Sequence, residues 1–253
     1  MLRKGTGAVL LALLLAGCGA PAAGQPTTTP EKNAAPAGTA RMSRAPVPPV
    51  SYPATGSETW STADGEGRTP SGGGQLLRYR VSVERDIKGL PVAGVAKAIT
   101  ATLNDRRGWT AGGTWRLRRV GPEQPADFTI YLVTPGTRDD LCDDVPDGYT
   151  SCRNGNKVVL NVARWVKAVP GYGGDLSTYR QYMVNHEVGH RLGHGHELCP
   201  GRGEPAPVMQ QQTLGLHGCE PNAWPYLDGR RYAGRSGAYD DELPPREGAR
   251  RAG

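Results

Sequence analysis

Apolar and polar residues alternate in three stretches of the chain, and each stretch predicts a β-strand. Residues 77–83 alternate in part, with Tyr79, Val81 and Val83 separated by polar residues. Residues 115–120 form a second strand-like run. The third, residues 128–133, reads Phe-Thr-Ile-Tyr-Leu-Val and is apolar enough to fit a strand that is buried in a sheet.

A helix is expected between the first two of these strands. Pro91 favours a helix start, because its fixed φ suits the first turn and its missing N–H needs no partner there. Gly108 and the pair Gly112-Gly113 would end the helix. The apolar residues at helical spacing are Val92, Val95, Ala96, Ile99 and Leu103.

A hairpin and a long helix follow the third strand. Residues 149–152 and 157–162 are strand-like and flank Asn154-Gly155, whose residues both tolerate positive φ, so a hairpin is expected there. Asp175 to Ser177 then offer N-caps for a long helix. The order strand, helix, strand, strand, hairpin, helix predicts an α+β domain built on a twisted mixed sheet.

The N-terminus carries a targeting signal. Residues 1–17 begin with two cations, Arg3 and Lys4, and continue with an apolar run that is too short to span a bilayer. They end in Leu15-Ala16-Gly17-Cys18, which resembles the lipobox of bacterial lipoproteins. The resemblance implies cleavage before Cys18, lipidation of its thiol, and attachment to the outer face of the cell membrane. The alternative is an ordinary secreted protein, cut near Ala20.

Composition divides the rest of the chain into three parts. Residues 18–74 are rich in Pro, Gly, Ala, Thr and Ser without apolar periodicity, which predicts a disordered tether. Residues 229–253 are Arg-rich and Gly-rich and predict a disordered tail. Residues 75–228 remain as one domain, long enough for a sizeable core. The net charge is +6, but the basic residues are scattered without interleaved aromatic residues, which argues against a nucleic-acid partner.

Four cysteines follow Cys18, and an even number in an exported chain favours disulfides. The pairing between nearest neighbours joins Cys142 to Cys152 and Cys199 to Cys219, but the sequence does not choose among the three possible pairings. A zinc site built from cysteines is the rival interpretation. No pair has the close C-x-x-C spacing that such sites favour.

The long helix carries residues suited to metal chemistry. His186 and His190 are four residues apart, which places both imidazoles on one helix face within reach of a single ion. Glu187 follows the first histidine, where its carboxylate could accept a proton from a water that the metal activates. The alternative interpretation of these residues is an ordinary polar helix face.

A catalytic zinc site needs a third protein ligand and one open position. His194 continues the spacing, but on an unbroken helix it would lie about 12 Å along the axis from His186, too far for one ion. Gly193 and Gly195 can end the helix, since glycine adopts left-handed backbone conformations. His196 could then turn back to the metal. The alternatives for the third ligand are His194, Glu204 and Glu220.

The run His186-Glu187-x-x-His190-x-x-Gly193-x-x-His196 resembles the zinc signature of the metzincin proteases. More narrowly, the chain resembles an uncharacterised family of lipid-anchored or secreted actinobacterial proteins that bear this zinc helix. The resemblance covers roughly residues 76–228. It implies Zn²⁺ as cofactor, with His186, His190 and His196 as ligands and Glu187 as general base.

The resemblance implies further features of the fold. Met209, within Pro207-Val208-Met209-Gln210, matches the methionine turn beneath the metal, although a lone methionine is often core filler. Residues 148–152 match the edge strand that pairs with extended substrate. The C-terminal subdomain would be small and clamped by Cys199–Cys219. Some metzincins place an oxyanion-stabilising tyrosine where this chain has Gln211, which leaves Tyr226 and His217 as weak candidates for that role.

These observations predict a zinc-dependent endopeptidase that hydrolyses peptide bonds of extracellular proteins or peptides, with Glu187 as general base. Two alternatives stay open. One is a zinc-stabilised cell-envelope binding module without turnover, and the other is a hydrolase of a cell-wall amide.

Overall fold

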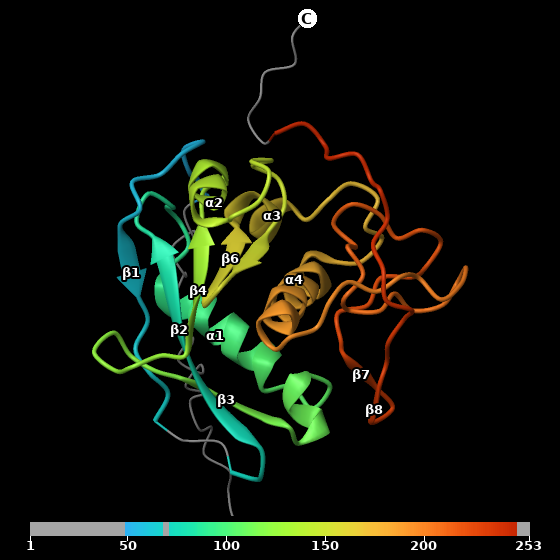
Figure 1. Ribbon diagram of the computed structural model, residues 1–253. Helices are drawn as coiled ribbons and strands as arrows, with labels where there is room; N and C mark the ends of the chain where they lie inside the picture. The colour runs from blue at the N-terminus through green and yellow to red at the C-terminus, as the bar shows by residue number, and fades with distance from the viewer. Residues whose placement is uncertain (1–48, 68–70, 247–253) are drawn as a thin grey trace, which may run out of the picture. The chain divides into compact units, whose positions relative to one another are not determined.

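The computed structural model of the protein describes residues 49–67 and 71–246 (Figure 1). The expected signal peptide with Cys18 lies outside the described residues, as does residue 247 onward. Helices in the described part of the chain are all too short or too polar to cross a membrane.

Six strands of the described chain form one mixed sheet, in the order β1-β2-β4-β6-β5, with β3 paired to β2. Strands β2, β3, β4 and β6 run parallel, and the short edge strands β1 and β5 run antiparallel to their neighbours. The sheet is twisted in Figure 1, and the α+β prediction is confirmed. The strands are β1 (Trp60–Thr62), β2 (Gln75–Glu84), β3 (Trp115–Arg119), β4 (Phe128–Val133), β5 (Cys152–Asn154) and β6 (Lys157–Asn161).

The two faces of the sheet follow the period-two pattern of the strands. In β4, Phe128, Ile130 and Leu132 point into the main core, where α1 (Val92–Leu103) and α4 (Leu176–Arg191) pack. Val133 belongs instead to a smaller cluster that includes Cys142 and Cys152. Figure 1 shows α4 between the sheet and the orange and red C-terminal loops, so the metal-helix candidate is at the centre of the fold.

The predicted α1 begins directly after Pro91, but it ends at Leu103, earlier than the expected stop at Gly108. Its predicted apolar face is confirmed, since Val95, Ala96, Ile99 and Leu103 are buried. Three further short helices were not predicted, namely η1 (Trp109–Gly112), α2 (Pro135–Leu141) and α3 (Val162–Lys167).

The hairpin exists, but its position differs from the prediction. Its first strand, β5, covers residues 152–154, so the expected strand at 149–152 and the expected edge strand at 148–152 are placed too early. Asn154 pairs with Lys157, and the turn is therefore Gly155-Asn156, with Gly155 at φ 57°. The residues before Cys152, which were expected to belong to the strand, form a loop. The side-chain amide of Asn161 holds this loop by donating to the carbonyls of Gly148 at 3.1 Å and Tyr149 at 3.2 Å.

The predicted tether and tail are each wrong in part. Within the expected tether, β1 pairs with β2, placing Trp60 opposite Glu84. Within the expected tail, β8 (Arg230–Arg231) pairs with β7 (Tyr226–Leu227). Both segments owe their structure to partners distant in sequence, which composition does not reveal. Residues 18–48, 68–70 and 247–253 of these two predictions lie outside the described residues.

Candidate metal centre

Three histidines from two segments converge at the end of α4. The Nε2 atom of His190 lies 3.2 Å from that of His186 and 3.1 Å from that of His196. Such a group could hold a metal ion, because the three ring nitrogens lie within 4.8 Å of one another. Burial lowers the pKa of all three imidazoles, that of His196 to about 4, which favours their neutral forms, and a neutral imidazole has one ring nitrogen that can bind a cation.

Backbone carbonyls orient two of these rings. The Nδ1 atom of His186 lies 2.9 Å from the Val208 carbonyl oxygen, and that of His190 lies 2.9 Å from the His194 carbonyl oxygen. A carbonyl can only accept, so each Nδ1 carries the proton and donates it. This tautomer leaves Nε2 unprotonated, which is the arrangement found around metal-binding histidines.

The turn that brings His196 into place begins at Gly193. Leu192 caps α4, Gly193 has φ 94°, and the His194 amide donates to the Gly189 carbonyl at 3.0 Å. Together with the bond from the Gly193 amide to the His190 carbonyl (3.1 Å), this is a Schellman motif, which needs a left-handed residue after the cap. The predicted helix end at Gly193 is confirmed.

His194 does not join the cluster of three. Its ring stacks on Trp109, with the ring centroids 4.3 Å apart, while its main-chain carbonyl holds His190. Among the described residues, Glu204 and Glu220 also do not join it. The geometry therefore favours His196 over each of the three alternatives.

Met209 lies directly beneath α4. The Gln210 amide donates to the Pro207 carbonyl at 2.9 Å, which closes a tight turn, and Met209 is fully buried. A methyl group at Gly189 would lie 2.4 Å from the Met209 Sδ, so the helix can rest on the turn only because residue 189 lacks a side chain. Val208 of the same turn holds His186. The turn thus packs against α4 and helps to position His186.

Glu187 faces the same space as the three histidines. Burial raises its pKa to about 8, and a cation held nearby would favour the ionised carboxylate. Its Oε2 atom is buried and has no hydrogen-bond partner among the described residues. An unpaired buried carboxylate oxygen calls for an explanation, and a water or metal ligand in the adjoining space is one that fits.

An open cavity of about 500 Å³ adjoins the histidines and Glu187. One wall consists of the loop before β5 and the strand itself, and the opposite wall consists of the residues that follow the methionine turn. We call these two walls the upper rim (residues 144–153) and the lower rim (residues 211–214). Strand β5 is an edge of the sheet, and its residues Cys152 and Arg153 line this cavity.

A family model described as a protein of unknown function (DUF3152) matches residues 47–224, which is more than half of the 253-residue chain. The chain belongs to the DUF3152 family. No curated protein and no solved structure matches it. The residues matched by the DUF3152 model include all three histidines, Glu187, Met209 and both cysteine pairs, and the match ends before β7.

Other predicted residues of this DUF3152 chain are placed as follows. Two disulfides join Cys142 to Cys152 and Cys199 to Cys219, which is the nearest-neighbour pairing. Neither candidate for oxyanion stabilisation lines the cavity. The Tyr226 hydroxyl packs against Gly112, and His217 pairs with Asp241 at 3.0 Å. Gln211 does line the cavity, beside Tyr182, whose hydroxyl donates to the Gln210 carbonyl.

Buried amides hold the lower rim, which has no regular secondary structure. The side-chain amide of Gln210 donates to the Gly215 and Leu216 carbonyls at 3.1 and 2.9 Å. The side-chain amide of Gln212 donates to the Asn222 backbone carbonyl at 2.7 Å, and the side-chain amide of Asn222 donates to the Ala206 carbonyl at 2.9 Å. All three of these side chains are buried. Cys199–Cys219 adds a covalent link nearby.

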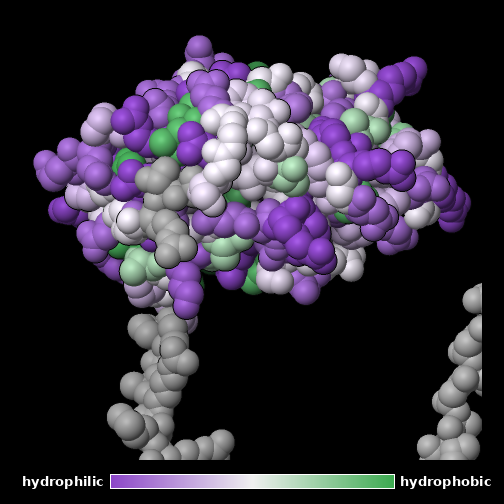
Figure 2. All heavy atoms as spheres, turned by 90° about the horizontal axis from the view of Figure 1, so that it is seen from below, coloured by the Kyte–Doolittle hydropathy of each residue, from purple (hydrophilic) through white to green (hydrophobic). Residues whose placement is uncertain are grey.

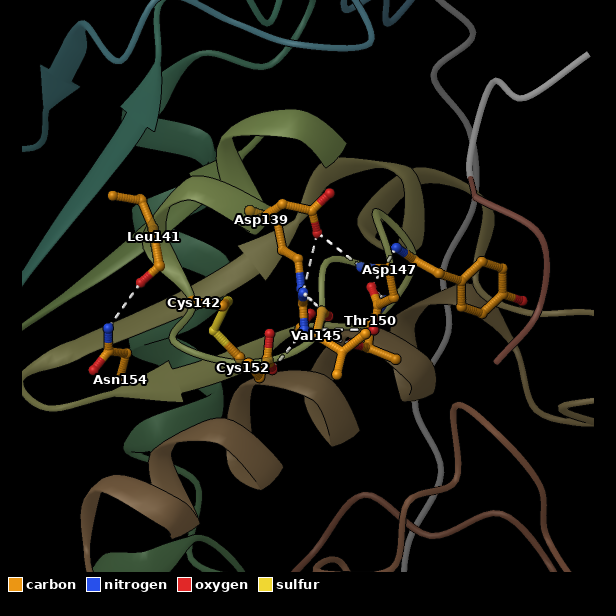
Figure 3. A network of polar contacts seen from close by, with 12 residues as sticks. Asp139, Leu141, Cys142, Val145, Asp147, Thr150, Cys152 and Asn154 are labelled. Atoms are coloured by element: carbon orange, nitrogen blue, oxygen red, sulfur yellow. Dashed lines mark hydrogen bonds and ion pairs between the residues drawn. A yellow bond between two sulfur atoms is a disulfide. The ribbon is translucent and has the colours of Figure 1, made fainter. Parts of the chain in front are cut away.

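A buried arginine that sequence reasoning missed holds the upper rim. Arg138 of α2 is 1% exposed, and its guanidinium reaches Asp144 at 2.8 Å and Thr150 at 2.9 Å. Its neighbour Asp139 accepts from the backbone amides of Asp147 and Gly148, at 3.0 and 2.9 Å (Figure 3). Two consecutive charged residues therefore fix the loop that forms one wall of the cavity.

We expect Arg138→Leu to lower the free energy of unfolding by about 3–5 kcal/mol, because it leaves the buried Asp147 carboxylate without its cation and the buried Asp139 carboxylate with only Arg246. Urea denaturation of the oxidised protein would measure this. Arg78→Ala is the control: it removes an ion pair whose two side chains are 44% and 31% exposed and should cost at most about 1 kcal/mol. Equal losses in the two variants would contradict a structural role for Arg138.

Proposed function

We propose that this chain is a zinc-dependent endopeptidase of metzincin type that acts on protein or peptide substrates outside the cell. The observation that carries the proposal is the convergence of three histidines, two of them oriented by backbone carbonyls, with an unpartnered carboxylate oxygen, all in the wall of one open cavity. Structural zinc sites are closed by four protein ligands, whereas catalytic sites use three and keep one position open.

The donor set fits zinc. Neutral imidazole nitrogens are favoured zinc ligands, and His186, His190 and His196 offer three of them in one place. When bound, the ion would lower the pKa of a water towards about 7 and polarise the substrate carbonyl.

Glu187 supplies the proton transfers. Its Oε2 atom would accept a proton from the attacking water as the water oxygen bonds to the carbonyl carbon. The same carboxyl group would then donate that proton to the leaving nitrogen as the C–N bond breaks. The products are a carboxylic acid and an amine, and the remaining proton of the water passes from the acid to the amine, giving a carboxylate and an ammonium group. Glu187 returns to its starting state.

The edge strand β5 offers a place for an extended substrate. It is the last strand on its side of the sheet, and Ser151, Cys152 and Arg153 line the cavity beside the histidines. A peptide laid along this edge would gain main-chain hydrogen bonds, which is how many proteins bind extended chains. This feature supports a peptide substrate over a compact small molecule.

We also propose export, with a lipid anchor at Cys18. Two disulfides in the described chain support an oxidising compartment, where such bonds persist. An anchored enzyme of this kind would meet its substrates at the cell surface.

The proposal predicts cleavage of peptides by the zinc-loaded protein, and loss of that cleavage on treatment with a chelator. Elemental analysis should give one zinc per chain, and mass spectrometry of a broad peptide library should locate the cleaved bonds. Zinc rebinding after dialysis should restore cleavage.

One zinc per chain without cleavage of any peptide would contradict the endopeptidase. It would favour the non-catalytic binding module instead. Cleavage of cell-wall fragments in place of peptides would favour the amide hydrolase.

A further inference from the structure

The C-terminal segment, which we define as residues 232–246, connects the two sides of the cavity. On the lower side, its Gly237 amide donates to the His196 carbonyl at 3.0 Å. Asp241 pairs with His217, whose ring stacks on Tyr239 with the centroids 3.5 Å apart. These contacts fasten the first part of the segment beside the third histidine.

The far end of the C-terminal segment is fastened to the upper rim. Arg246 forms an ion pair with Asp139, the residue that also holds the rim loop. The Arg246 side chain lies over Gly148, where a methyl group would come within 2.7 Å of its Cγ. Gly148 also has φ 56°, so glycine serves both the turn and the contact there. The segment therefore spans from the His196 and His217 side of the cavity to the upper rim.

Between these two attachments, Leu243 lines the cavity. Val145 lines it from the upper rim, and its carbonyl accepts from the buried Arg138 at 3.3 Å. Two segments that are almost a hundred residues apart in sequence thus present aliphatic side chains to one space.

These two residues are unusual in their exposure. Within residues 49–67 and 71–246, Val145 (71%) and Leu243 (45%) are the only large hydrophobic side chains that are exposed. The face of the molecule in Figure 2 is mainly polar, with only small hydrophobic areas. Exposed apolar side chains that gather at one cavity mark a binding surface, whereas scattered ones need no explanation.

Leu243 lies in the wall of the cavity and does not fill it. A side chain that plugged the cavity would be buried there, yet nearly half of Leu243 remains exposed and about 500 Å³ stays open beside it. The two aliphatic residues are therefore available to an incoming side chain.

We infer that Val145 and Leu243 form a subsite for a large apolar side chain of the substrate, and that the C-terminal segment completes this subsite. The inference rests on the proposed function, because it names the kind of peptide that the cavity selects. Burying one aliphatic side chain in such a subsite is worth about tenfold to a hundredfold in affinity.

Binding can be tested apart from cleavage in a Glu187→Gln protein loaded with zinc. Two pools of fluorescent peptides of equal length would be compared by anisotropy, one with Leu or Phe and the other with Ser or Asn at the varied position. We expect the apolar pool to bind at least tenfold more tightly. Leu243→Ser and Val145→Ser, added singly, should each remove most of this preference and leave binding of the polar pool unchanged.

Glu242→Ser is the matched control, because it changes an exposed neighbour in the same segment that does not line the cavity. It should keep the full preference. Circular dichroism and zinc content should be the same in all variants.

Three results would overturn the subsite. These are equal binding of the two pools, no binding of either pool, and tighter binding of both pools in Leu243→Ser, which would make the segment an inhibitory plug. Failure of the proposed function gives a different pattern. In that case the apolar pool binds, Leu243→Ser weakens it, and the wild-type protein cleaves neither pool.

Discussion

Replacing Glu187 by Ala should lower kcat/KM for peptide cleavage by about 10²–10⁴-fold while zinc stays bound. The reason is that its buried Oε2 atom has no hydrogen-bond partner among the described residues, which leaves this oxygen available to the reacting water that we propose. The three neighbouring histidines, which we propose as the zinc ligands, are left in place by this substitution. Initial rates on a cleaved library peptide and elemental analysis of the same samples would measure both quantities.

Glu204→Ala controls for the loss of a carboxylate, since Glu204 is exposed and absent from the histidine cluster. It should keep both zinc and activity. If Glu187→Ala still cleaved peptides at the wild-type rate, the assigned mechanism would be wrong even with zinc present.

Replacing His196 by Ala should weaken zinc binding by more than about a hundredfold. Residues that only hydrogen-bond to metal ligands already cost about 10–100-fold in metal affinity when they are replaced, and a direct ligand contributes more. His194→Ala should leave the affinity almost unchanged. That substitution removes only a ring stacked on Trp109 and keeps the main-chain carbonyl that orients His190. Competition with a chromophoric chelator would give both dissociation constants.

The reverse result, zinc lost from His194→Ala and kept in His196→Ala, would assign the third ligand differently. Both variants should be checked for folding by the urea midpoint, so that loss of zinc is separated from loss of structure.

The parts of the fold that the sequence predicts are those with long local patterns. In strands β2 and β4 and in helix α1, apolar residues recur at a regular spacing over at least six residues. The spacing is regular because each element turns one face towards the core. The site was predicted for a related reason. Gly193 is the residue at which the chain must turn, and the spacing of the histidines around it is local.

Short elements with distant partners escaped prediction. Strand β1 has three residues within a Pro-rich and Gly-rich stretch and exists because β2 pairs with it. Helix α2 had a signal, since Thr134-Pro135 is a typical helix start, but its seven residues show no apolar period. In the sequence, nothing distinguishes Arg138 and the acidic residues around it from an exposed charged stretch. Only the tertiary fold shows that this arginine is buried.

The amide-held lower rim has a consequence for sequence variation. Loops normally tolerate substitutions and insertions, because few of their backbone groups depend on particular side chains. Here the carbonyls of Gly215, Leu216 and Asn222 are satisfied by two glutamines, so an insertion between residues 210 and 222 would leave buried polar groups unpaired at about 1–3 kcal/mol each. In a deep mutational scan, Gln210 and Gln212 should therefore be as intolerant of substitution as buried positions in the strands of the sheet.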